Sequence, residues 1–459
     1  MRWMSVVALT LAGLGVASPG LAQTTGGKFT AEGKTVVLYK HNLADRPHLL
    51  TVCVASGRVS LLLGMPPGWQ GVAVINAGQC YSASWPLKNG QMIAVDPSQK
   101  SDGTYATPAG YRLDLKKTSS GDYTVTERGS GTKDTYNSTG TLLKVSDRNG
   151  GEITVEQHDE GAEHKGFKLT DKRSGRFVDL VKTDASQWQA KDNSGRTVVY
   201  DLNPSGDLAK VTDTEGKATT FGYDADRRLT KITTPEGRVT VFTYDSHNRV
   251  TSLKRATAFD GSGETGPTYN YRYSSDAPNT AGTTTVTDPV GDTTTYTYES
   301  DGEITKVVDA LGHSRKRTYD ANRNVTTAED AMGVGSTPGN VTAYGWDARS
   351  NPTSSKLPTG ATSSLTAYQT IAGADVPGKF TTADGVSVSY TYDTAGNTTK
   401  ETVAGAEGGT RTFTYNPATP TCGGFEGQRC EVKDANGKTT KFSYDAKGNL
   451  TLTATTGRL

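Results

Sequence analysis

The sequence predicts an all-β protein in which a small N-terminal β-sandwich or barrel is followed by a long array of β-hairpins. Turn-forming residues are abundant, since the 459 residues include 53 Gly and 18 Pro. Tyrosine, with 21 copies, and runs of threonine supply side chains that strands favour. A Tyr-Asp dipeptide also recurs at spacings of 21 to 23 residues. A fixed period above ~20 residues indicates stacked supersecondary units.

Residues 1–22 are predicted to be a secretory signal peptide. Arg2 supplies the positive start, the apolar run from Val6 to Val16 is too short to span a bilayer, and cleavage is expected before Gln23. An uncleaved anchor is the alternative. No later apolar run is long enough for a membrane-spanning helix. We therefore expect a protein that is secreted or held at the cell surface, with no membrane span after cleavage.

Residues 23–111 are predicted to form the N-terminal β domain, because short alternating apolar runs there are separated by turn signals such as Pro66-Pro67-Gly68. Export favours disulfides. Four cysteines allow three pairings, and proximity in the sequence favours Cys53–Cys80 and Cys422–Cys430. Residues 112–135 are polar and Gly-rich, and are interpreted as a junction or as degenerate repeats.

Residues 136–459 carry the repeat. Its clearest copies are Tyr200-Asp201, Tyr223-Asp224, Tyr244-Asp245, Tyr319-Asp320, Tyr392-Asp393 and Tyr444-Asp445. A turn follows each pair, and several of these turns end in Gly or Asn, at Gly206, Asn248, Gly302, Asn324, Gly396 and Gly448. A short Leu-Thr or Ile-Thr segment comes next, then a second turn with an acidic residue or Pro before Gly, and then an alternating strand that leads to the next Tyr-Asp.

Hairpin chemistry explains this pattern. Alternation places Phe242 and Tyr244 on one face of a strand and Thr243 on the other. The Asp can accept hydrogen bonds from backbone N–H groups of the turn, and Gly or Asn tolerates a positive φ there. One hairpin cannot bury its own apolar face, so we expect the hairpins to extend one sheet, with the tyrosines largely buried on a common face.

The pattern of Tyr-Asp, turn, Gly, Leu-Thr, and then Asp and Gly before the next strand resembles the YD-repeat, or RHS-repeat, family. The resemblance covers Tyr136 to the C-terminus and implies a long sheet that spirals into a hollow shell. In bacteria such shells enclose a toxic C-terminal domain or occur in cell-surface proteins, and the repeats are also described as carbohydrate-binding. RHS proteins usually continue into further repeats, a plug-like core with a self-cleaving Asp site, and a toxin tip. None of these is present before Leu459, so we expect a truncated product, a fragment or a short secreted relative. The repeats between Tyr136 and Leu459 are expected to cover too little sheet to close a shell, which predicts a partial, open shell.

Catalytic and cofactor motifs are not evident in the sequence. The chain has neither a Gly-x-Ser-x-Gly elbow nor a phosphate-binding Gly-rich loop. The segment His158 to His164 holds two His and three carboxylates but lacks the spacing of a zinc site, so a solvated loop is favoured. Asp-x-Asn-Gly turns, as at Asp434 to Gly437, share part of calcium-loop chemistry, but hairpin turns explain them. We expect no metal and no cofactor. The balance of 49 basic and 48 acidic residues argues against nucleic acid as a partner.

Three functions are compatible with these observations. The favoured hypothesis is a secreted, non-enzymatic RHS scaffold, the shell-forming part of a polymorphic toxin or cell-surface interaction protein that lacks the core and toxin tip. A carbohydrate-binding surface protein is the alternative, and a polysaccharide-degrading enzyme on an elongated β scaffold is less favoured. Expected partners are surface glycans, a protein partner or a cargo. The sequence does not define the oligomeric state.

Three repeat units are longer than the others, and the extra residues must leave the sheet at hairpin ends. These units run from Tyr244 to Tyr273, from Tyr319 to Trp346 and from Tyr415 to Tyr444. The last one holds the Cys422–Cys430 loop. A disulfide would fix the shape of this loop and lower the ordering cost of binding. We therefore single out Phe425, Glu426 and Arg429 as a candidate binding loop, with a tolerated insertion as the alternative.

Overall fold

The computed structural model describes residues 28–31, 34–37, 51–54, 59–60, 83–86, 92–95, 104–105, 107, 110–137, 142–159, 165–256, 258–260, 263–276, 280–300, 302–333, 339–405 and 408–456. These residues contain strands, turns and irregular segments and no helix, which confirms the all-β prediction. The predicted signal peptide and Cys80 lie outside the described residues, so the structure leaves the signal peptide and the Cys53–Cys80 pairing as predictions. No helix in the described part is long and apolar enough to cross a membrane.

The N-terminal strands form small separate sheets. They are β1 (Lys28–Ala31), β2 (Lys34–Val37), β3 (Thr51–Val54), β4 (Val59–Ser60), β5 (Ala83–Pro86) and β6 (Met92–Val95). Strands β1 to β4 pair in sequence order, and β5 pairs with β6.

One large sheet contains almost all the other strands. Its first half consists of β7 (Leu113–Lys117), β8 (Tyr123–Glu127), β9 (Lys133–Tyr136), β10 (Leu142–Ser146), β11 (Glu152–Asp159), β12 (Lys165–Asp171), β13 (Phe177–Asp184), β14 (Gln187–Asp192), β15 (Thr197–Leu202), β16 (Leu208–Thr212), β17 (Ala218–Tyr223), β18 (Leu229–Thr233), β19 (Val239–Tyr244) and β20 (Val250–Ala256). It therefore begins inside the segment 112–135, which the sequence left as a junction or degenerate repeats.

The second half consists of β23 (Thr268–Tyr273), β24 (Gly282–Thr287), β25 (Thr293–Tyr298), β26 (Ile304–Val308), β27 (Ser314–Tyr319), β28 (Val325–Glu329), β29 (Val341–Trp346), β30 (Pro352–Lys356), β31 (Thr362–Thr366), β34 (Lys379–Thr381), β35 (Ser387–Tyr392), β36 (Thr398–Val403), β37 (Thr410–Tyr415), β38 (Arg429–Lys433), β39 (Thr439–Tyr444) and β40 (Leu450–Thr456). Two small hairpins leave the sheet, namely β21 (Ala258–Asp260) with β22 (Gly263–Thr265), and β32 (Gln369–Ile371) with β33 (Ala374–Val376).

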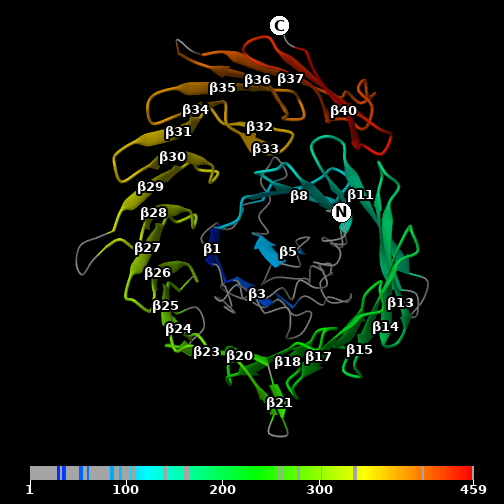
Figure 1. The fold of residues 1–459 in the computed structure, drawn as a ribbon, viewed down its shortest axis with the longest axis vertical. Helices are drawn as coiled ribbons and strands as arrows, with labels where there is room; N and C mark the ends of the chain where they lie inside the picture. Colours follow the sequence, from blue (N-terminus) through cyan, green and yellow to red (C-terminus); the bar gives the residue numbers. More distant parts are fainter. Residues whose placement is uncertain are drawn as a thin grey trace.

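The 30 strands of the large sheet pair antiparallel with their neighbours and curve into an oval ring (Figure 1). Strand β7 pairs with β8 and β40 pairs with β39, and no ladder joins β40 to β7 among the described residues. The sheet is therefore open, as predicted. The last strands nevertheless return to lie beside the first ones, so the two ends of the sheet meet without pairing.

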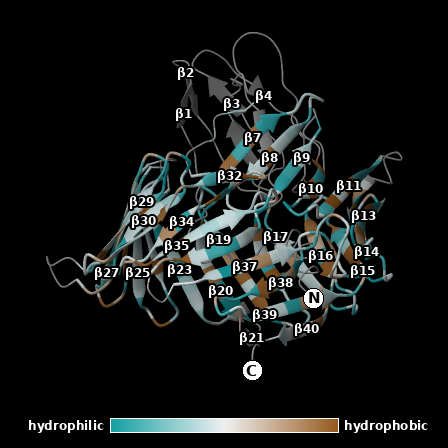
Figure 2. Ribbon diagram, turned by 90° about the horizontal axis from the view of Figure 1, so that it is seen from above, coloured by the Kyte–Doolittle hydropathy of each residue, from teal (hydrophilic) through white to brown (hydrophobic). Residues whose placement is uncertain are grey.

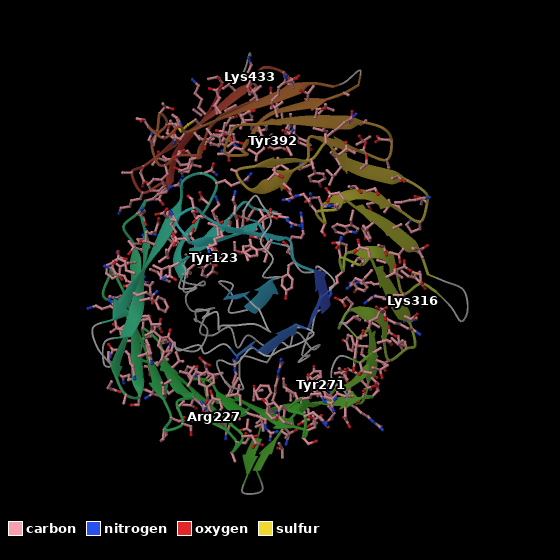
Figure 3. All side chains as sticks on the ribbon, turned by 180° about the vertical axis from the view of Figure 1, so that it is seen from behind. Tyr123, Arg227, Tyr271, Lys316, Tyr392 and Lys433 are labelled. Carbon is pink, nitrogen blue, oxygen red and sulfur yellow. A yellow bond between two sulfur atoms is a disulfide. The ribbon has the colours of Figure 1, made fainter. Side chains whose placement is uncertain are left out.

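The two faces of the sheet differ in chemistry, and Figure 2 shows hydrophobic and hydrophilic residues interleaved along the strands. We call the face that carries the Tyr of each Tyr-Asp pair the tyrosine face. In β35, Tyr390 and Tyr392 of this face are half-buried, whereas Ser389 and Thr391 of the other face are exposed. Figure 3 shows Tyr392 on the inner side of the ring and Lys433, from the opposite face, on its outer side. The tyrosine face is therefore the inner, concave face.

Several repeat tyrosines form a recurring hydrogen bond to the hairpin partner of their own strand. The hydroxyl of Tyr319 donates to the carbonyl of Ile304 at 2.8 Å. The same bond, spanning 15 residues, joins Tyr223 to Leu208, Tyr244 to Leu229, Tyr392 to Pro377 and Tyr444 to Arg429. Burial raises the pKa of Tyr223 and Tyr392 to about 12, so their hydroxyls remain protonated donors at neutral pH. The repeat therefore needs tyrosine at this position for both its ring and its hydroxyl.

Replacing Tyr319 with phenylalanine is expected to lower the free energy of unfolding by about 1 kcal/mol, because a net hydrogen bond of this kind contributes about 0.5–1.5 kcal/mol. Urea unfolding of both proteins would measure the difference. Tyr296 also lies on the tyrosine face, and its hydroxyl has no hydrogen bond among the described residues. Tyr296→Phe is therefore the matched control, and equal losses for the two variants would contradict this role of the hydroxyl.

Most repeat turns match the predicted chemistry, and the turn at Asn324 needs a correction. In a typical turn, Asp245 Oδ1 accepts the backbone N–H groups of His247 and Arg249, both at 2.9 Å, and Asn248 has a φ of 63°. Asn324 was predicted to occupy the same left-handed position, but the structure assigns it to Arg323, with a φ of 63°. The Asn324 side chain instead donates to Asp320 Oδ2 at 3.0 Å, so it stabilises the turn from the following position.

Candidate functional site

The two ends of the large sheet contact each other along a line of hairpin ends that we call the seam. Its early half comprises residues 110–114, 126–131, 147–150 and 173, and its late half comprises residues 322–323, 347–351, 370–375, 396–397 and 425–427. The strands that carry the two halves are separated by about 200 residues or more in the sequence. The seam brings them together through side chains and turn backbone, without a β-ladder.

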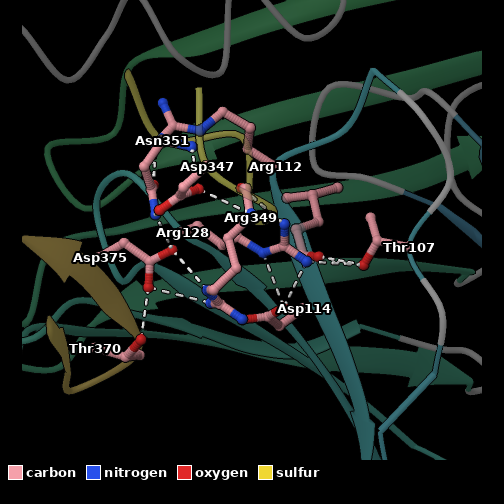
Figure 4. Close-up of polar contacts among 10 residues, drawn as sticks. Thr107, Arg112, Asp114, Arg128, Asp347, Arg349, Asn351, Thr370 and Asp375 are labelled. Carbon is pink, nitrogen blue, oxygen red and sulfur yellow. Dashed lines mark hydrogen bonds and ion pairs between the residues drawn. The ribbon is translucent and has the colours of Figure 1, made fainter. Parts of the chain in front are cut away.

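Arg349 is the centre of the seam (Figure 4). Its guanidinium donates to Asp375 at 2.9 Å and to Asp114, on β7, at 2.8 Å. Arg128 contributes from the early half, where it bonds Asp114 at 2.9 Å and the carbonyl of Arg349 at 3.0 Å. Asp114 thus holds one arginine from each end of the sheet.

Local turn geometry positions Arg349. The turn follows Trp346, and Asp347 Oδ1 accepts the backbone N–H groups of Arg349 at 2.8 Å and Asn351 at 2.9 Å. Asn351 is 1% exposed, and its side-chain amide donates to Asp347 and Asp375 and accepts from Arg112 at 2.8 Å. An ordinary repeat turn therefore supplies a rigid base for this part of the seam.

Asp375 reaches the seam on an extra hairpin. Strands β32 and β33 leave the main sheet between β31 and β34, and the backbone N–H of Asp375 donates to the carbonyl of Arg128 at 2.7 Å. Thr370, on the other strand of the hairpin, donates its hydroxyl to Asp375 at 2.7 Å. This hairpin therefore has a structural role, which is to carry a buried carboxylate to the other end of the sheet.

A second group of contacts extends the seam. The Arg148 side chain donates to the carbonyl of Gly396 at 2.9 Å, and the Asn397 amide donates to Asn149 at 2.7 Å. Arg173 lies over the ring of Phe425 at 5.7 Å and also donates to the carbonyl of Asn149. The two ends of the sheet are therefore joined at more than one repeat.

The hydrogen bonds of the seam set the charge state of its buried acid. Burial by itself would raise the pKa of Asp375, but hydrogen bonds from Arg349, Thr370 and Asn351 outweigh it and hold this pKa below its ordinary value. The hydrogen bonds to Asp375 in turn raise the pKa of Arg349. Both groups are therefore charged at neutral pH.

Acid is expected to weaken the seam. The pKa of Asp375 is lower in the folded protein than the ~3.9 of an unfolded chain, so its contribution to stability is fully present above that value and is lost as the pH falls through the folded pKa. We expect the urea midpoint to change little from pH 8 to 5 and to fall below ~pH 4. The fall should be shallower in Asp375→Asn, measured over the same pH range. Identical pH profiles would contradict this assignment.

The structure separates the three residues of the predicted binding loop. Cys422 and Cys430 form a disulfide with a Cα–Cα distance of 5.7 Å. Phe425 packs against Arg173 in the seam, and Glu426 lies beside Gly150 of the early half. Arg429 instead lies over the rings of Phe413 and Tyr415 on the tyrosine face, at 5.1 and 5.9 Å. The loop thus places Phe425 and Glu426 against the chain's own first repeats, and whether it also binds a ligand stays a prediction.

Other residues that the sequence singled out have structural environments. His158, on β11, contacts Asp179, on β13, at 2.7 Å across the intervening strand β12, while residues 160–164 lie outside the described part. Five of the signature Asp residues accept backbone N–H groups of their own turns, namely Asp224, Asp245, Asp320, Asp393 and Asp445. Asp201 is the exception, because it lies within β15 and contacts Lys210 at 2.9 Å and Gln187 at 2.8 Å. Among the described residues, no group of three or more His, Cys, Asp or Glu side chains could hold a metal ion.

Sequence reasoning missed the residues at the centre of the seam, namely Arg112, Asp114, Arg128, Arg349, Asn351 and Asp375. One feature of the sequence could have revealed one of these residues, Asp375. The 46 residues between Trp346 and Tyr392 span two periods, but the segment after Tyr368 does not follow the repeat pattern. Tyr368 itself donates its hydroxyl to the carbonyl of Pro352 at 2.8 Å, as several other repeat tyrosines do. The departure begins directly after it, at the hairpin that carries Asp375.

Comparison with known proteins identifies the repeat and finds distant structural likeness. The RHS Repeat family model matches residues 200–239, 226–258 and 427–459. No curated protein matches the chain. The crystal structure of TcdB2-TccC3 is 11% identical over 91% of this chain and 26% of that chain, with a TM-score of 0.34. That of TcdB2-TccC3-Cdc42 is 12% identical over 94% and 26%, with a TM-score of 0.33.

The Tc holotoxin pore of Photorhabdus luminescens is 11% identical over 94% of this chain and 26% of that chain, with a TM-score of 0.35. The chain thus spans about a quarter of the length of these solved structures, and the likeness is too distant to carry an argument about function. The matched repeats lie in β15 to β20 and β38 to β40, and the same tyrosine bond and Asp turn recur in the strands between them. The chain therefore contains RHS repeats at these three places.

Proposed function

We propose that the chain is an extracellular, non-enzymatic scaffold, the shell-forming part of a toxin or cell-surface interaction protein, whose concave face surrounds another polypeptide. The observation that carries the proposal is the combination of the inward tyrosine face and the seam. A curved sheet whose ends are joined by the Arg349–Asp114 ion pair and by backbone hydrogen bonds is suited to enclosing a volume. An enzyme would instead need a convergent set of acid, base and nucleophile.

The tyrosine face supplies a surface for a polypeptide guest. Half-buried aromatic rings line it in strand after strand, as Phe242 does in β19 and Tyr271 does in β23. Aromatic rings contribute large contact areas at low conformational-entropy cost, and they contact many different side chains. Such a surface favours broad contact with a polypeptide over recognition of one small molecule.

Binding of an unfolded, uncharged model polypeptide to the purified chain would test this proposal. We expect the triple variant Phe242→Ser, Tyr271→Ser and Tyr390→Ser to weaken binding at least tenfold. The matched control replaces Thr243, Arg272 and Thr391 with serine on the outer face of the same strands, and should change binding less than twofold. Equal losses in the two variants would contradict the proposal, as would release of reducing sugars from polysaccharides by the wild-type chain.

A further inference from the structure

The aromatic row of the tyrosine face gives way to arginine at one strand. Two residues before the strand-ending Tyr or Trp, eight strands carry a half-buried aromatic ring. These residues are Phe221, Phe242, Tyr271, Tyr296, Tyr344, Tyr390, Phe413 and Phe442. In β27 this position is Arg317, and Arg315 precedes it on the same face; both side chains are exposed. The row therefore changes from aromatic to basic between Tyr296 and Tyr344.

The register confirms that the two arginines face inward. Arg317 pairs with Ala328 and Arg315 pairs with Val307, which in turn pairs with Tyr296 of the tyrosine face. Alternate residues of a strand lie about 6.8 Å apart on one face. Two guanidinium groups at that spacing therefore project from β27 into the interior of the ring.

A depression of about 620 Å³ adjoins these arginines. Its walls come from β27, from residues 328–330, 340 and 342, and from the turn of Leu357 to Thr359, and they include the acidic residues Glu329 and Asp330. Leu357 is 48% exposed, so the depression offers an apolar wall beside its basic one. The depression therefore combines the positive charges of Arg315 and Arg317 with a concave, partly apolar surface.

Neither arginine forms a hydrogen bond or an ion pair with the described part of the chain, and the neighbouring acids are engaged elsewhere. Glu329 accepts Lys316 at 3.0 Å and the backbone N–H of Gly339 at 3.1 Å. Asp330 accepts the backbone and side-chain N–H groups of Asn340, both at 2.9 Å. The Asn340 side chain lowers the pKa of Asp330, and the charge of Arg315 adds to this effect. Neither arginine is directly paired with these carboxylates, and both exposed guanidinium groups can contact an external anion.

Replacing an aromatic ring with arginine sacrifices apolar packing along the row, and a local departure from a structural rule without a packing gain marks a functional position. We propose that Arg315 and Arg317 form an anion-binding site for an extended acidic segment of a polypeptide held within the ring. This inference rests on the proposed function. Carboxylates at alternate positions of an extended peptide also lie about 6.8 Å apart, so a segment with acidic residues at every second position would pair both arginines at once.

Fluorescence anisotropy with two labelled ten-residue peptides tests the site on the full chain. One peptide alternates glutamate and threonine, and the other has the same composition with its glutamates in one block. We expect the alternating peptide to bind at least fivefold more tightly. The double variant Arg315→Gln and Arg317→Gln should weaken its binding at least tenfold. Arg411→Gln is the matched control, because Arg411 is exposed on the same face but pairs across the sheet with Glu401; it should change binding less than twofold.

A charge-reversed variant keeps the proposal falsifiable if the glutamine variant alters folding. The double variant Arg315→Glu and Arg317→Glu should not bind the alternating glutamate peptide and should bind a peptide in which lysine replaces each glutamate. Equal binding of the two glutamate peptides, an equal loss in the Arg411 variant, or displacement of the peptide by low-millimolar inorganic phosphate would overturn the assignment. Because the model polypeptide that tests the scaffold is uncharged, failure of this site and failure of the scaffold give different results.

Discussion

Replacing Tyr136 with alanine is expected to lower the free energy of unfolding by about 3–5 kcal/mol, the cost of removing a large buried aromatic ring. Tyr136 is 1% exposed and packs in the most buried part of the tyrosine face. The cluster around it includes Leu115, Val125, Leu142, Val155, Phe167, Leu180, Ala190 and Tyr200. Because these residues come from β7 to β15, the cavity would weaken the strands that carry the early half of the seam.

Urea unfolding followed by circular dichroism would measure this loss. Tyr136→Phe is the control, because it keeps the ring and removes only the hydroxyl, and it should lower the free energy of unfolding by less than about 1.5 kcal/mol. If the alanine variant were as stable as the phenylalanine variant, Tyr136 would not be a core residue and the described packing of β7 to β15 would be wrong.

Replacing Arg349 with alanine is expected to lower the free energy of unfolding by roughly 2–3 kcal/mol, because the carboxylate of Asp375 would stay buried without its cation. The Asp375 side chain is 2% exposed, so solvent cannot replace the lost partner. We place the value below the usual range for a buried pair because Arg349 itself is 41% exposed. Thr370 and Asn351 would still donate to the carboxylate, which also limits the loss.

The matched control is Arg196→Ala, which breaks an ion pair with Asp192 that lies within one turn of the sheet and has an arginine that is 51% exposed. Surface pairs of this kind contribute less than about 1 kcal/mol. Urea unfolding of both variants at one salt concentration would compare them. A loss for Arg349→Ala no larger than that for Arg196→Ala would show that the seam adds no more stability than a surface pair.

Most of the fold follows from the sequence because the repeat is local. The Tyr-Asp spacing and the alternation in strands such as β19 predict hairpins, since each contact of a hairpin joins residues that are close in the chain. The error at Asn324 arose because the turn requires a positive φ one position earlier, where Arg323 tolerates it. Gly and Asn therefore indicate that a turn is present, but they do not show which of its residues has the positive φ.

The seam could not be predicted because it depends on the curvature accumulated over the whole sheet. The small twist between each pair of neighbouring strands adds up along the sheet. Their sum determines whether Arg349 comes within hydrogen-bonding distance of Asp114, 235 residues earlier. The Cys422–Cys430 loop illustrates the same point. The sequence indicated an insertion that a disulfide would hold, but only the three-dimensional structure shows that Phe425 packs against Arg173.

Backbone amide hydrogen exchange resolved to single residues is the most direct test of whether the two ends of the open sheet are joined at the seam. Two amides bond across the seam, Gly110 to the carbonyl of Asn322 at 2.9 Å and Asp375 to the carbonyl of Arg128 at 2.7 Å. We expect both to be protected in the wild-type chain and to exchange at least tenfold faster in Arg349→Ala, while amides in β19 keep their protection. If both amides of the wild-type chain exchanged as fast as those of exposed repeat turns, the two ends of the sheet would not be joined.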